Sequence, residues 1–326
     1  MAMRLRAACG WRPSQTPSRA SSREATPAAV ADTARSKVSR LLGHVLLNAT
    51  PGDAASVCWA AEHFAVEVLG RERQWLKIAG GQKAHVLQAV MRSAPAEWPL
   101  LEIGAYVGYS AIRLACAGGV VEQPRSVVSL EVDADHAQVA RAVVSLAGLT
   151  HAVTVRTGHS EDLIPSLGGP PFAAVFMDQS GARFSEDLSC LLGRGLLAPG
   201  AMVVTDNVLK PGAPAFLWRL LRDGRFQTSI LAMPEFAMPG VEDWMCVARL
   251  KPQAAFDRRP LPAMEDRGAL PALIRRLERQ ANAIRERASQ PGGVDFRDWE
   301  AHVDQMRDGM RSAGICPHGG VLPEDD

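Results

Sequence analysis

Three oxygen-bearing side chains stand at the ends of two short apolar runs in this 326-residue sequence. Asp178 ends the run 173–178, and Asp206 and Asn207 end the run that begins at residue 202. Because the carboxyl ends of parallel strands share one edge of a sheet, where ligands bind, these side chains are candidates for a single site. Two carboxylates and an amide, without Cys or His, favour Mg²⁺ over zinc. The alternative is that they cap the next helix or turn.

A glycine-containing turn is the second candidate site. Gly104 follows an apolar run and Gly108 opens a helix, with the spacing G-x-x-x-G. Glycine lets the backbone approach a ligand, although a purely structural turn has the same pattern. The spacing is not the G-x-G-x-x-G of dinucleotide folds, so a pyrophosphate is not the expected ligand. Glu131 ends the next run, where an acid hydrogen-bonds ribose hydroxyls in doubly wound folds, and the two features together favour a cofactor.

A parallel sheet is the element that would bring these residues together. Beyond Pro99, apolar runs alternate with helical segments, and the runs cover 100–103, 126–131, 153–157, 173–178 and 202–206. Such Val- and Leu-rich strands predict a parallel sheet buried on both faces. Two later runs, 228–233 and 245–250, predict an antiparallel pair at the sheet edge. The fold class is therefore α/β, doubly wound and Rossmann-like.

Helices are predicted before and between these strands. Apolar spacing predicts them from residue 34 to the Pro51-Gly52 break, over 53–69, over 83–93 and over 133–147. Asp53 and Asp133 are the expected N-caps, and Gly70 is the expected stop of the second helix.

The N-terminal residues 1–36 differ in composition from the α/β domain expected at 37–251. They hold six arginines and two acids, with many Ser, Thr, Ala and Pro and no apolar periodicity. Such a segment cannot bury enough surface to offset the entropy of ordering, so we predict a disordered tail. Its Arg- and Ser-rich character also fits an organelle transit segment. The expected location is cytoplasmic, with an organelle as the alternative.

Residues 252–326 form an extension with two amphipathic patterns. Apolar residues recur at three- and four-residue spacing over 270–288 and over 296–310, and Gln290-Pro291-Gly292-Gly293 separates them. Asp295 is the expected cap of the second helix. This predicts a helical hairpin. Its stripes can pack on each other, on the main domain or on a protein partner.

Composition excludes several classes of protein. The net charge of +1 argues against nucleic-acid binding driven by bulk charge. No apolar run is long enough to predict a membrane span. The six cysteines lie far apart without zinc spacing, and free thiols are expected.

Four stretches of the sequence resemble the catechol O-methyltransferases, a family of class I S-adenosylmethionine-dependent methyltransferases. They are LLEIGAYVGYSAIRLA, SLEVDADHAQVARAVVSLAGL, TGHSEDLIPSL and TDNVLKPGAPAFL. The similarity runs in order from Lys37 to Leu250. It implies a seven-stranded sheet, S-adenosylmethionine, one Mg²⁺ and methyl transfer to one hydroxyl of a small vicinal aromatic diol.

The resemblance also implies roles for individual positions. The implied cofactor contacts are Gly104, Tyr106, Ser110, Glu131, Ser160, Glu161 and Asp178, with Glu161 in place of the usual glutamine. The implied metal ligands are Asp178, Asp206 and Asn207. The implied substrate side consists of Trp75, Asn207, Pro211 and Glu235. A core anchor is the alternative for Trp75, and the alignment slips by a residue or two near Glu235.

One departure from the family concerns catalysis. The family pattern D-H-W-K-D-R supplies a lysine as general base, whereas this chain reads Asp178-Gln179-Ser180-Gly181-Ala182-Arg183, with glycine in the lysine's place. Arg183 stays protonated and cannot act as a base. Bound metal lowers the pKa of a hydroxyl by itself. Lys210 is the candidate replacement base, and an ordinary surface lysine is the alternative.

Three functions follow from these observations. The first is an Mg²⁺- and S-adenosylmethionine-dependent catechol-type O-methyltransferase. The second is a cofactor-binding scaffold that has lost turnover and meets a protein partner through its C-terminal helices. The third keeps the chemistry but takes another acceptor, because Ser180 in place of the family's tryptophan widens the pocket.

Overall fold

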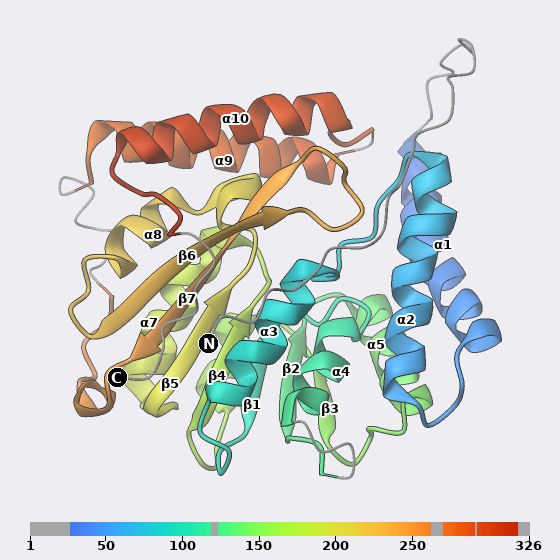
Figure 1. The fold of residues 1–326 in the computed structure, drawn as a ribbon, viewed down its shortest axis with the longest axis horizontal. Helices are drawn as coiled ribbons and strands as arrows, with labels where there is room; N and C mark the ends of the chain where they lie inside the picture. The colour runs from blue at the N-terminus through green and yellow to red at the C-terminus, as the bar shows by residue number, and fades with distance from the viewer. Residues whose placement is uncertain (1–26, 119–122, 262–269, 291, 319–326) are drawn as a thin grey trace, which may run out of the picture.

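The computed structural model describes residues 27–118, 123–261, 270–290 and 292–318 and contains a seven-stranded sheet (Figure 1). The strands are β1 (Leu100–Ile103), β2 (Val127–Glu131), β3 (Val153–Thr157), β4 (Phe172–Met177), β5 (Leu197–Thr205), β6 (Phe226–Pro234) and β7 (Glu242–Leu250). Their order is β3-β2-β1-β4-β5-β7-β6. The first five are parallel, while β7 pairs antiparallel with both β5 and β6. The predicted fold class and antiparallel edge are confirmed.

Helices cover both faces of the sheet. One face carries α1 (Pro27–Asn48), α2 (Ala54–His63), α3 (Gln82–Ser93), α4 (Tyr109–Ala115) and α5 (Ala134–Leu146). The other carries α6 (Ser160–Ser166), α7 (Phe184–Arg194), α8 (Pro214–Leu220), α9 (Ala272–Ser289) and α10 (Phe296–Ser312). Short helical turns are η1 (Phe64–Leu69), η2 (Gly70–Glu72), η3 (Cys116–Gly118), η4 (Gly181–Arg183), η5 (Val208–Gly212) and η6 (Pro252–Phe256).

Alternate side chains of the central strands serve the two cores. Leu100 of β1 joins the core under α1 to α5, while Leu101 and Ile103 join the core under α6 to α10. Successive side chains of a strand point to opposite faces, so a strand buried on both faces is apolar at most of its positions, and Glu102 of β1 is an exception. This is why the central strands read as continuous apolar runs.

Two helix boundaries differ from the sequence prediction. Helix α1 begins at Pro27, inside the segment expected to be disordered, and the rest of that segment, residues 1–26, lies outside the described residues. The second helix does not stop at Gly70, whose φ of −59° is helical. The chain continues through η1 and η2, and Arg73 takes the left-handed conformation, with φ 56°. Burial of Leu69 favours this continuation over a glycine stop.

The predicted caps are present. Asp53, Asp133 and Asp295 each accept backbone hydrogen bonds at the start of α2, α5 and α10. Within the described residues no helix is long and apolar enough to cross a membrane. The five cysteines that the structure describes are free thiols.

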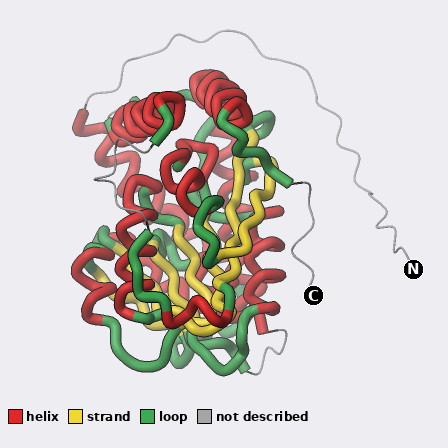
Figure 2. The backbone as a smooth tube through the Cα atoms, turned by 90° about the vertical axis from the view of Figure 1, so that its left-hand side faces the viewer, coloured by secondary structure: helices red, strands yellow, loops and turns green. Residues whose placement is uncertain are grey.

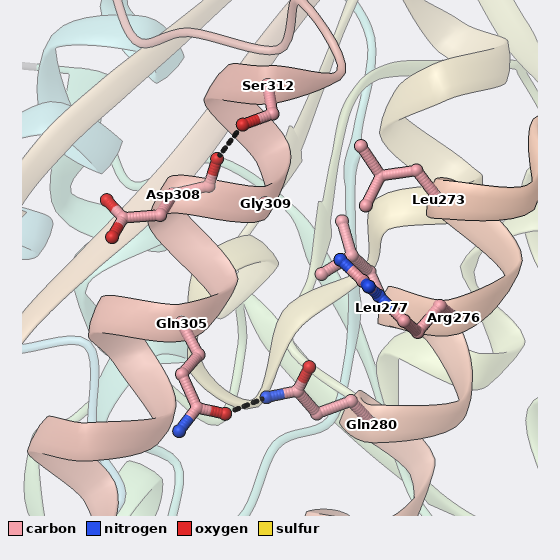
Figure 3. A pocket seen from close by; sticks show the side chains of 8 residues that line it. All are labelled: Leu273, Arg276, Leu277, Gln280, Gln305, Asp308, Gly309 and Ser312. Atoms are coloured by element: carbon pink, nitrogen blue, oxygen red, sulfur yellow. Dashed lines mark hydrogen bonds between the residues drawn. The ribbon is translucent and has the colours of Figure 1, made fainter.

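The C-terminal extension is the predicted hairpin, and Figures 1 and 2 show its two helices side by side. Its apolar stripes, for example Leu277 and Met306, belong to the core that also holds α7 and α8. A groove of ≈ 460 Å³ runs between the helices, bridged by a hydrogen bond from Gln280 to Gln305 (Figure 3). The hairpin therefore packs on itself and on the main domain.

Candidate active site

The glycine turn after β1 brings the backbone against the end of β4. Gly104 has φ 102°, and a Cβ there would lie 2.8 Å from the carbonyl group of Asp178. Gly108 has φ 82° and opens α4, and its missing side chain leaves room for the Ala140 carbonyl. Both positions need glycine for conformation and space. The close approach sets the predicted cofactor turn beside the predicted metal edge.

Glu131 fixes the shape of that turn from the end of β2. One carboxylate oxygen accepts a hydrogen bond from the backbone N–H of Tyr106 at 2.6 Å, and the other accepts from Asp133 at 2.9 Å. Tyr106 has a positive φ of 47°, and its ring meets the edge of His136. The acid predicted to bind a ribose thus also holds the backbone of the glycine turn.

A cluster around buried Asp187 connects the next two predicted cofactor residues. The Asp187 carboxylate accepts hydrogen bonds from Ser160 at 2.7 Å and from Gln179 at 2.9 Å. Arg183 lies 3.0 Å from Glu161 and 3.4 Å from Asp187. Glu161 and Gln179, which both depart from the family pattern, therefore belong to one polar network.

Glu102 is a buried acid on β1 that the sequence analysis did not select. It is fully buried and accepts a hydrogen bond from Ser129. Burial raises the pKa of Glu102 to about 7, although hydrogen bonds from Ser110 and Ser129 favour the charged form. Ser110 itself is buried. The signal in the sequence was an acid inside a four-residue buried strand.

The shift of Glu102 predicts a pH-dependent stability. Its pKa is higher in the folded protein than the ordinary 4.5, so folding favours its proton. Its contribution is complete below pH 4.5 and lost as the pH rises through about 7, a change of about 3 kcal/mol. We expect Glu102→Gln to remove this dependence and to gain stability relative to the wild type between pH 5 and pH 8. Urea unfolding of both proteins at pH 5 and pH 8 measures their free energies of unfolding. The same difference between variant and wild type at both pH values would contradict the assignment.

The predicted metal ligands lie at one edge of the sheet. Met177 pairs with Ile103 on one side and with Thr205 on the other, so the residues that follow β4 and β5 start from adjacent positions. The backbone N–H of Asp206 donates to Met177 at 3.1 Å. Burial, and next the neighbouring Asp206 carboxylate, raises the pKa of Asp178. The two carboxylates thus repel each other in a poorly solvated place.

The side chain of Lys83, from α3, reaches this edge of the sheet. Its ammonium group lies 2.8 Å from Asp206, 2.6 Å from Glu235 and 2.7 Å from Asp243, and it is 1% exposed. Although burial works in the opposite direction, the three carboxylates hold the pKa of Lys83 well above its ordinary value. Lys83 is therefore a permanent cation at the centre of an acidic cluster.

The acidic cluster carries more negative than positive charge. Four carboxylates, those of Asp178, Asp206, Glu235 and Asp243, face two buried ammonium groups, Lys83 and Lys210. Burial opposes it, but Lys210 and Lys83 hold the pKa of Glu235 down, to about 2. Burial raises the pKa of Asp243 to about 6 against the pull of Lys83. Full ionisation leaves two negative charges, which a divalent cation would balance.

The donor set also fits a hard divalent cation. Asp206 uses one carboxylate oxygen for Lys83 and for the N–H of Asn207. The Asn207 amide nitrogen donates to Asp243 at 2.9 Å, which fixes the amide so that its carbonyl oxygen is the free end. Within the described residues no three His, Cys, Asp or Glu side chains form a metal group by themselves, and the predicted set consists of two carboxylates and this amide oxygen. Such oxygens suit Mg²⁺.

The predicted acceptor side meets the C-terminal hairpin. Lys210 is buried, with its ammonium 3.6 Å from Glu235 and 5.0 Å from the centre of the Trp299 ring. The carbonyl of Pro211 lies 2.9 Å from His302, and the ring of Trp75 lies 5.3 Å from that of Phe296. Lys210 is therefore an ion-paired buried residue, not an exposed lysine.

Comparisons with known proteins agree with this arrangement. Residues 101–208 match a family described as a methyltransferase domain. Catechol O-methyltransferase of Bos taurus is 35% identical over 198 residues, which are 60% of this chain and 70% of that protein. The chain belongs to the catechol O-methyltransferase family.

More distant relatives show similar coverage. The transmembrane O-methyltransferase of Homo sapiens is 32% identical over 63% of this chain and 69% of its own. The solved O-methyltransferase TomG of Streptomyces achromogenes is 25% identical, with a TM-score of 0.48 over 58% of this chain and 89% of that one.

Gly181, where the resemblance implies a lysine, has a close neighbour in the structure. A Cβ on Gly181 would lie 2.8 Å from a guanidinium nitrogen of Arg285 and 3.3 Å from the Ala213 side chain. Arg285 belongs to α9, about a hundred residues later in the chain. The space beside Gly181 is therefore filled by a side chain of the extension.

Three site residues escaped the sequence analysis for different reasons. Lys83 stands at the start of a predicted helix, where a lysine usually faces solvent, so no local pattern marks it. Asp243 is an acid within an otherwise apolar strand, which was a usable signal. Arg285 lies on the polar side of a regular amphipathic pattern, and only the docking of α9 shows its role.

Proposed function

We propose that this member of the family is an S-adenosylmethionine- and Mg²⁺-dependent O-methyltransferase that acts on a vicinal aromatic diol. The observation that carries the proposal is the acidic edge where Asp178, Asp206 and Asn207 follow adjacent strands, beside the glycine turn at Gly104. Family membership supports the reaction, and the excess negative charge of the edge supports the metal.

The chain's residues divide the task between two sides of the site. On the cofactor side, Glu131 and the turn at Tyr106 would hold the ribose and methionine ends. On the acceptor side, Glu235, which pairs with Lys83 and Lys210, would accept a hydrogen bond from a second hydroxyl. When bound, Mg²⁺ would orient the diol and lower the pKa of a coordinated hydroxyl.

Methyl transfer then needs mainly positioning. A bond forms between the acceptor oxygen and the methyl carbon, the bond from that carbon to the sulfonium sulfur breaks, and the hydroxyl proton leaves to water. Holding the reacting groups in line and neutralising charge contribute most of the acceleration in such sites. A positioned general base contributes about 10²–10⁴-fold, so without one the activity should be weak to moderate and should rise with pH.

Paired acceptors test the proposal. Catechol, and phenol as the matched compound with one hydroxyl, are incubated with the protein, labelled S-adenosylmethionine and Mg²⁺, and products are identified by mass. We expect one methyl group on catechol and none on phenol. Equal methylation of both would contradict a diol-binding site, and a phenol-only product would indicate another acceptor class.

The cofactor side gives a separate prediction. Glu131→Ala removes a charged acceptor for the ribose hydroxyls, a contact worth about 1.5–3 kcal/mol. The affinity for S-adenosylmethionine should therefore fall roughly 10- to 150-fold. Titration calorimetry measures it, and an unchanged dissociation constant would show that the ribose binds elsewhere. Glu67→Ala is the control, because this exposed glutamate of η1 pairs with Arg71 and the change removes one carboxylate away from the proposed site.

A further inference from the structure

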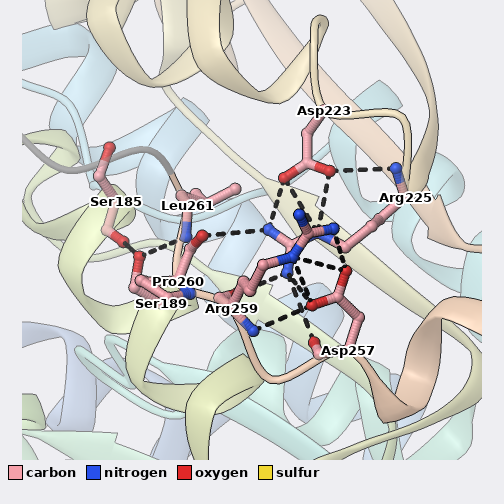
Figure 4. Close-up of polar contacts among 8 residues, drawn as sticks. All are labelled: Ser185, Ser189, Asp223, Arg225, Asp257, Arg259, Pro260 and Leu261. Carbon is pink, nitrogen blue, oxygen red and sulfur yellow. Dashed lines mark hydrogen bonds and ion pairs between the residues drawn. The ribbon is translucent and has the colours of Figure 1, made fainter.

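The C-terminal hairpin is fixed to the main domain before it begins. Arg225, at the start of β6, donates hydrogen bonds to the carbonyl groups of Asp257, Arg259 and Pro260, and Asp223 holds its guanidinium (Figure 4). The N–H of Leu261 donates to Ser189 of α7 at 3.1 Å. Residues 257–261 are thus anchored to the main domain by partly buried polar contacts.

The hairpin lies on η5, the turn that follows Asn207. Two residues of α10 contact consecutive residues of that turn: Trp299 lies under the Lys210 ammonium, and His302 contacts the Pro211 carbonyl. A Cβ on Gly212 would lie 2.7 Å from Met306. The contact therefore continues along the turn, from the candidate acceptor residues to its end.

The His302 contact has a defined direction. The Pro211 carbonyl only accepts, so Nε2 of His302 must carry the hydrogen and donate it at 2.9 Å. Burial lowers the pKa of His302, although the Pro211 contact works against this, so the neutral ring is favoured. His302 thereby holds the turn through a hydrogen bond that does not depend on its charge.

Arg285 of α9 holds the same turn from the other side. One guanidinium nitrogen donates to the Gly212 carbonyl, and another lies 2.5 Å from Asn282. The same Gly212-bound nitrogen occupies the space beside Gly181. A side chain at position 181 and Arg285 in its present position exclude each other.

Trp299 has a buried polar group without a hydrogen-bond partner among the described residues. It is 5% exposed, yet its indole N–H has no partner among the described residues. The Nε–H of Arg285 is also buried without a partner there. Buried donors of this kind usually find an acceptor in a protein, in water or in a ligand. Both donors belong to residues that contact η5.

We infer that the α9–α10 hairpin is a wall of the acceptor side, and that Arg285, Trp299 and His302 are positioning residues that hold the turn Asn207–Gly212 for the acceptor. Gly181 has no side chain and so leaves the space that the Arg285 guanidinium occupies. The inference deepens the proposed function and rests on it for the identity of the acceptor.

A double-mutant cycle tests the link between Gly181 and Arg285. Gly181→Ala, Arg285→Ala and the double variant are compared for kcat and KM with catechol. Each single change should raise KM about 10-fold, the size of a lost charged hydrogen bond. The double variant should be no worse than either, because both remove the same contact. Additive effects would overturn the link.

Matched variants separate positioning from general damage. Arg287→Ala on the same helix removes an ion pair to Asp298 and should leave KM unchanged. Trp299→Ala should raise KM, whereas Trp299→Phe should restore most of it, because an aromatic face still meets Lys210. Calorimetry with S-adenosylhomocysteine should give the wild-type affinity for every variant, which shows that each is folded. A rise in KM in Arg287→Ala equal to the rise in Arg285→Ala would overturn the inference.

Hydrogen exchange gives a readout without turnover. The N–H groups of Leu209 and Lys210 are bonded to Asp243, and that of Gly212 to Asn207, so their exchange is measurable. Arg285→Ala and Trp299→Ala should speed exchange there, and Arg287→Ala should not. If the wild type methylates no catechol, the proposed function fails while this measurement still decides whether the hairpin holds the turn. Unchanged exchange in both variants overturns the inference.

Discussion

Replacing Asp178 by alanine should lower Mg²⁺-dependent turnover by at least about 10³-fold, because a bound metal contributes several kcal/mol of charge stabilisation. The fold should not suffer. Asp178 lies in a poorly solvated place, where burial and the Asp206 carboxylate outweigh the attraction of Lys83, so its removal relieves repulsion. Steady-state kinetics over a range of Mg²⁺ concentrations and urea unfolding measure the two effects.

Asp178 is a cleaner target than Asp206. Asp206 pairs with buried Lys83, so its loss would change stability as well as metal binding. Asp308→Ala, on the exposed side of α10, is a control for the removal of one aspartate. Retention of most of the wild-type rate in Asp178→Ala would contradict the metal site.

Replacing Lys83 by methionine should have the largest effect on stability. The change leaves the carboxylates of Asp206, Glu235 and Asp243 without their shared cation. Breaking a buried ion pair by removing one partner typically costs about 3–5 kcal/mol. Urea unfolding at pH 8 should show a loss of this size, and Lys251→Met, at an exposed lysine, should show almost none.

The loss should shrink as the pH falls. Without Lys83 the pKa values of these carboxyl groups rise in the folded protein, so the variant binds protons on folding and is more stable at low pH. Unfolding of both proteins at pH 5 and pH 8 measures the change. The same loss at both pH values would mean that the carboxylates are neutral in the wild type.

The missing lysine of the family has a physical account in this structure. Lys210 is ion-paired with Glu235, and its ammonium lies over the Trp299 ring. Gly181 faces Arg285, so a lysine introduced there would first have to displace that guanidinium. We therefore expect the hydroxyl proton to leave to water, and a bound Mg²⁺ would lower the pKa of that hydroxyl.

Much of the fold could be predicted because its signals are local. Continuous apolar runs mark strands that must be apolar on both faces, and Asp53, Asp133 and Asp295 mark helix starts through their own side-chain hydrogen bonds. Strand ends also indicated the metal edge, because parallel strands end at a common edge. The prediction that Gly70 ends the second helix was wrong, because burial of Leu69 favours continued helical turns.

The parts of the site that could not be predicted depend on contacts between distant segments. Lys83 meets Glu235 and Asp243 across more than 150 residues, and no local pattern distinguishes it from a surface lysine. The apolar stripe of α9 predicts that the helix packs but not on which surface. The contact between Arg285 and Gly181 therefore could not be predicted from the sequence.

The metal dependence of the reaction can be measured as labelled methyl transfer from S-adenosylmethionine to catechol, followed in a single turnover while Mg²⁺ is varied. We expect a rate that saturates with Mg²⁺, falls to background in excess chelator and returns when Mg²⁺ is restored. Transfer that is undiminished in chelator would contradict the metal site. No transfer from a protein that still binds S-adenosylhomocysteine would contradict the enzyme itself and favour a cofactor-binding scaffold.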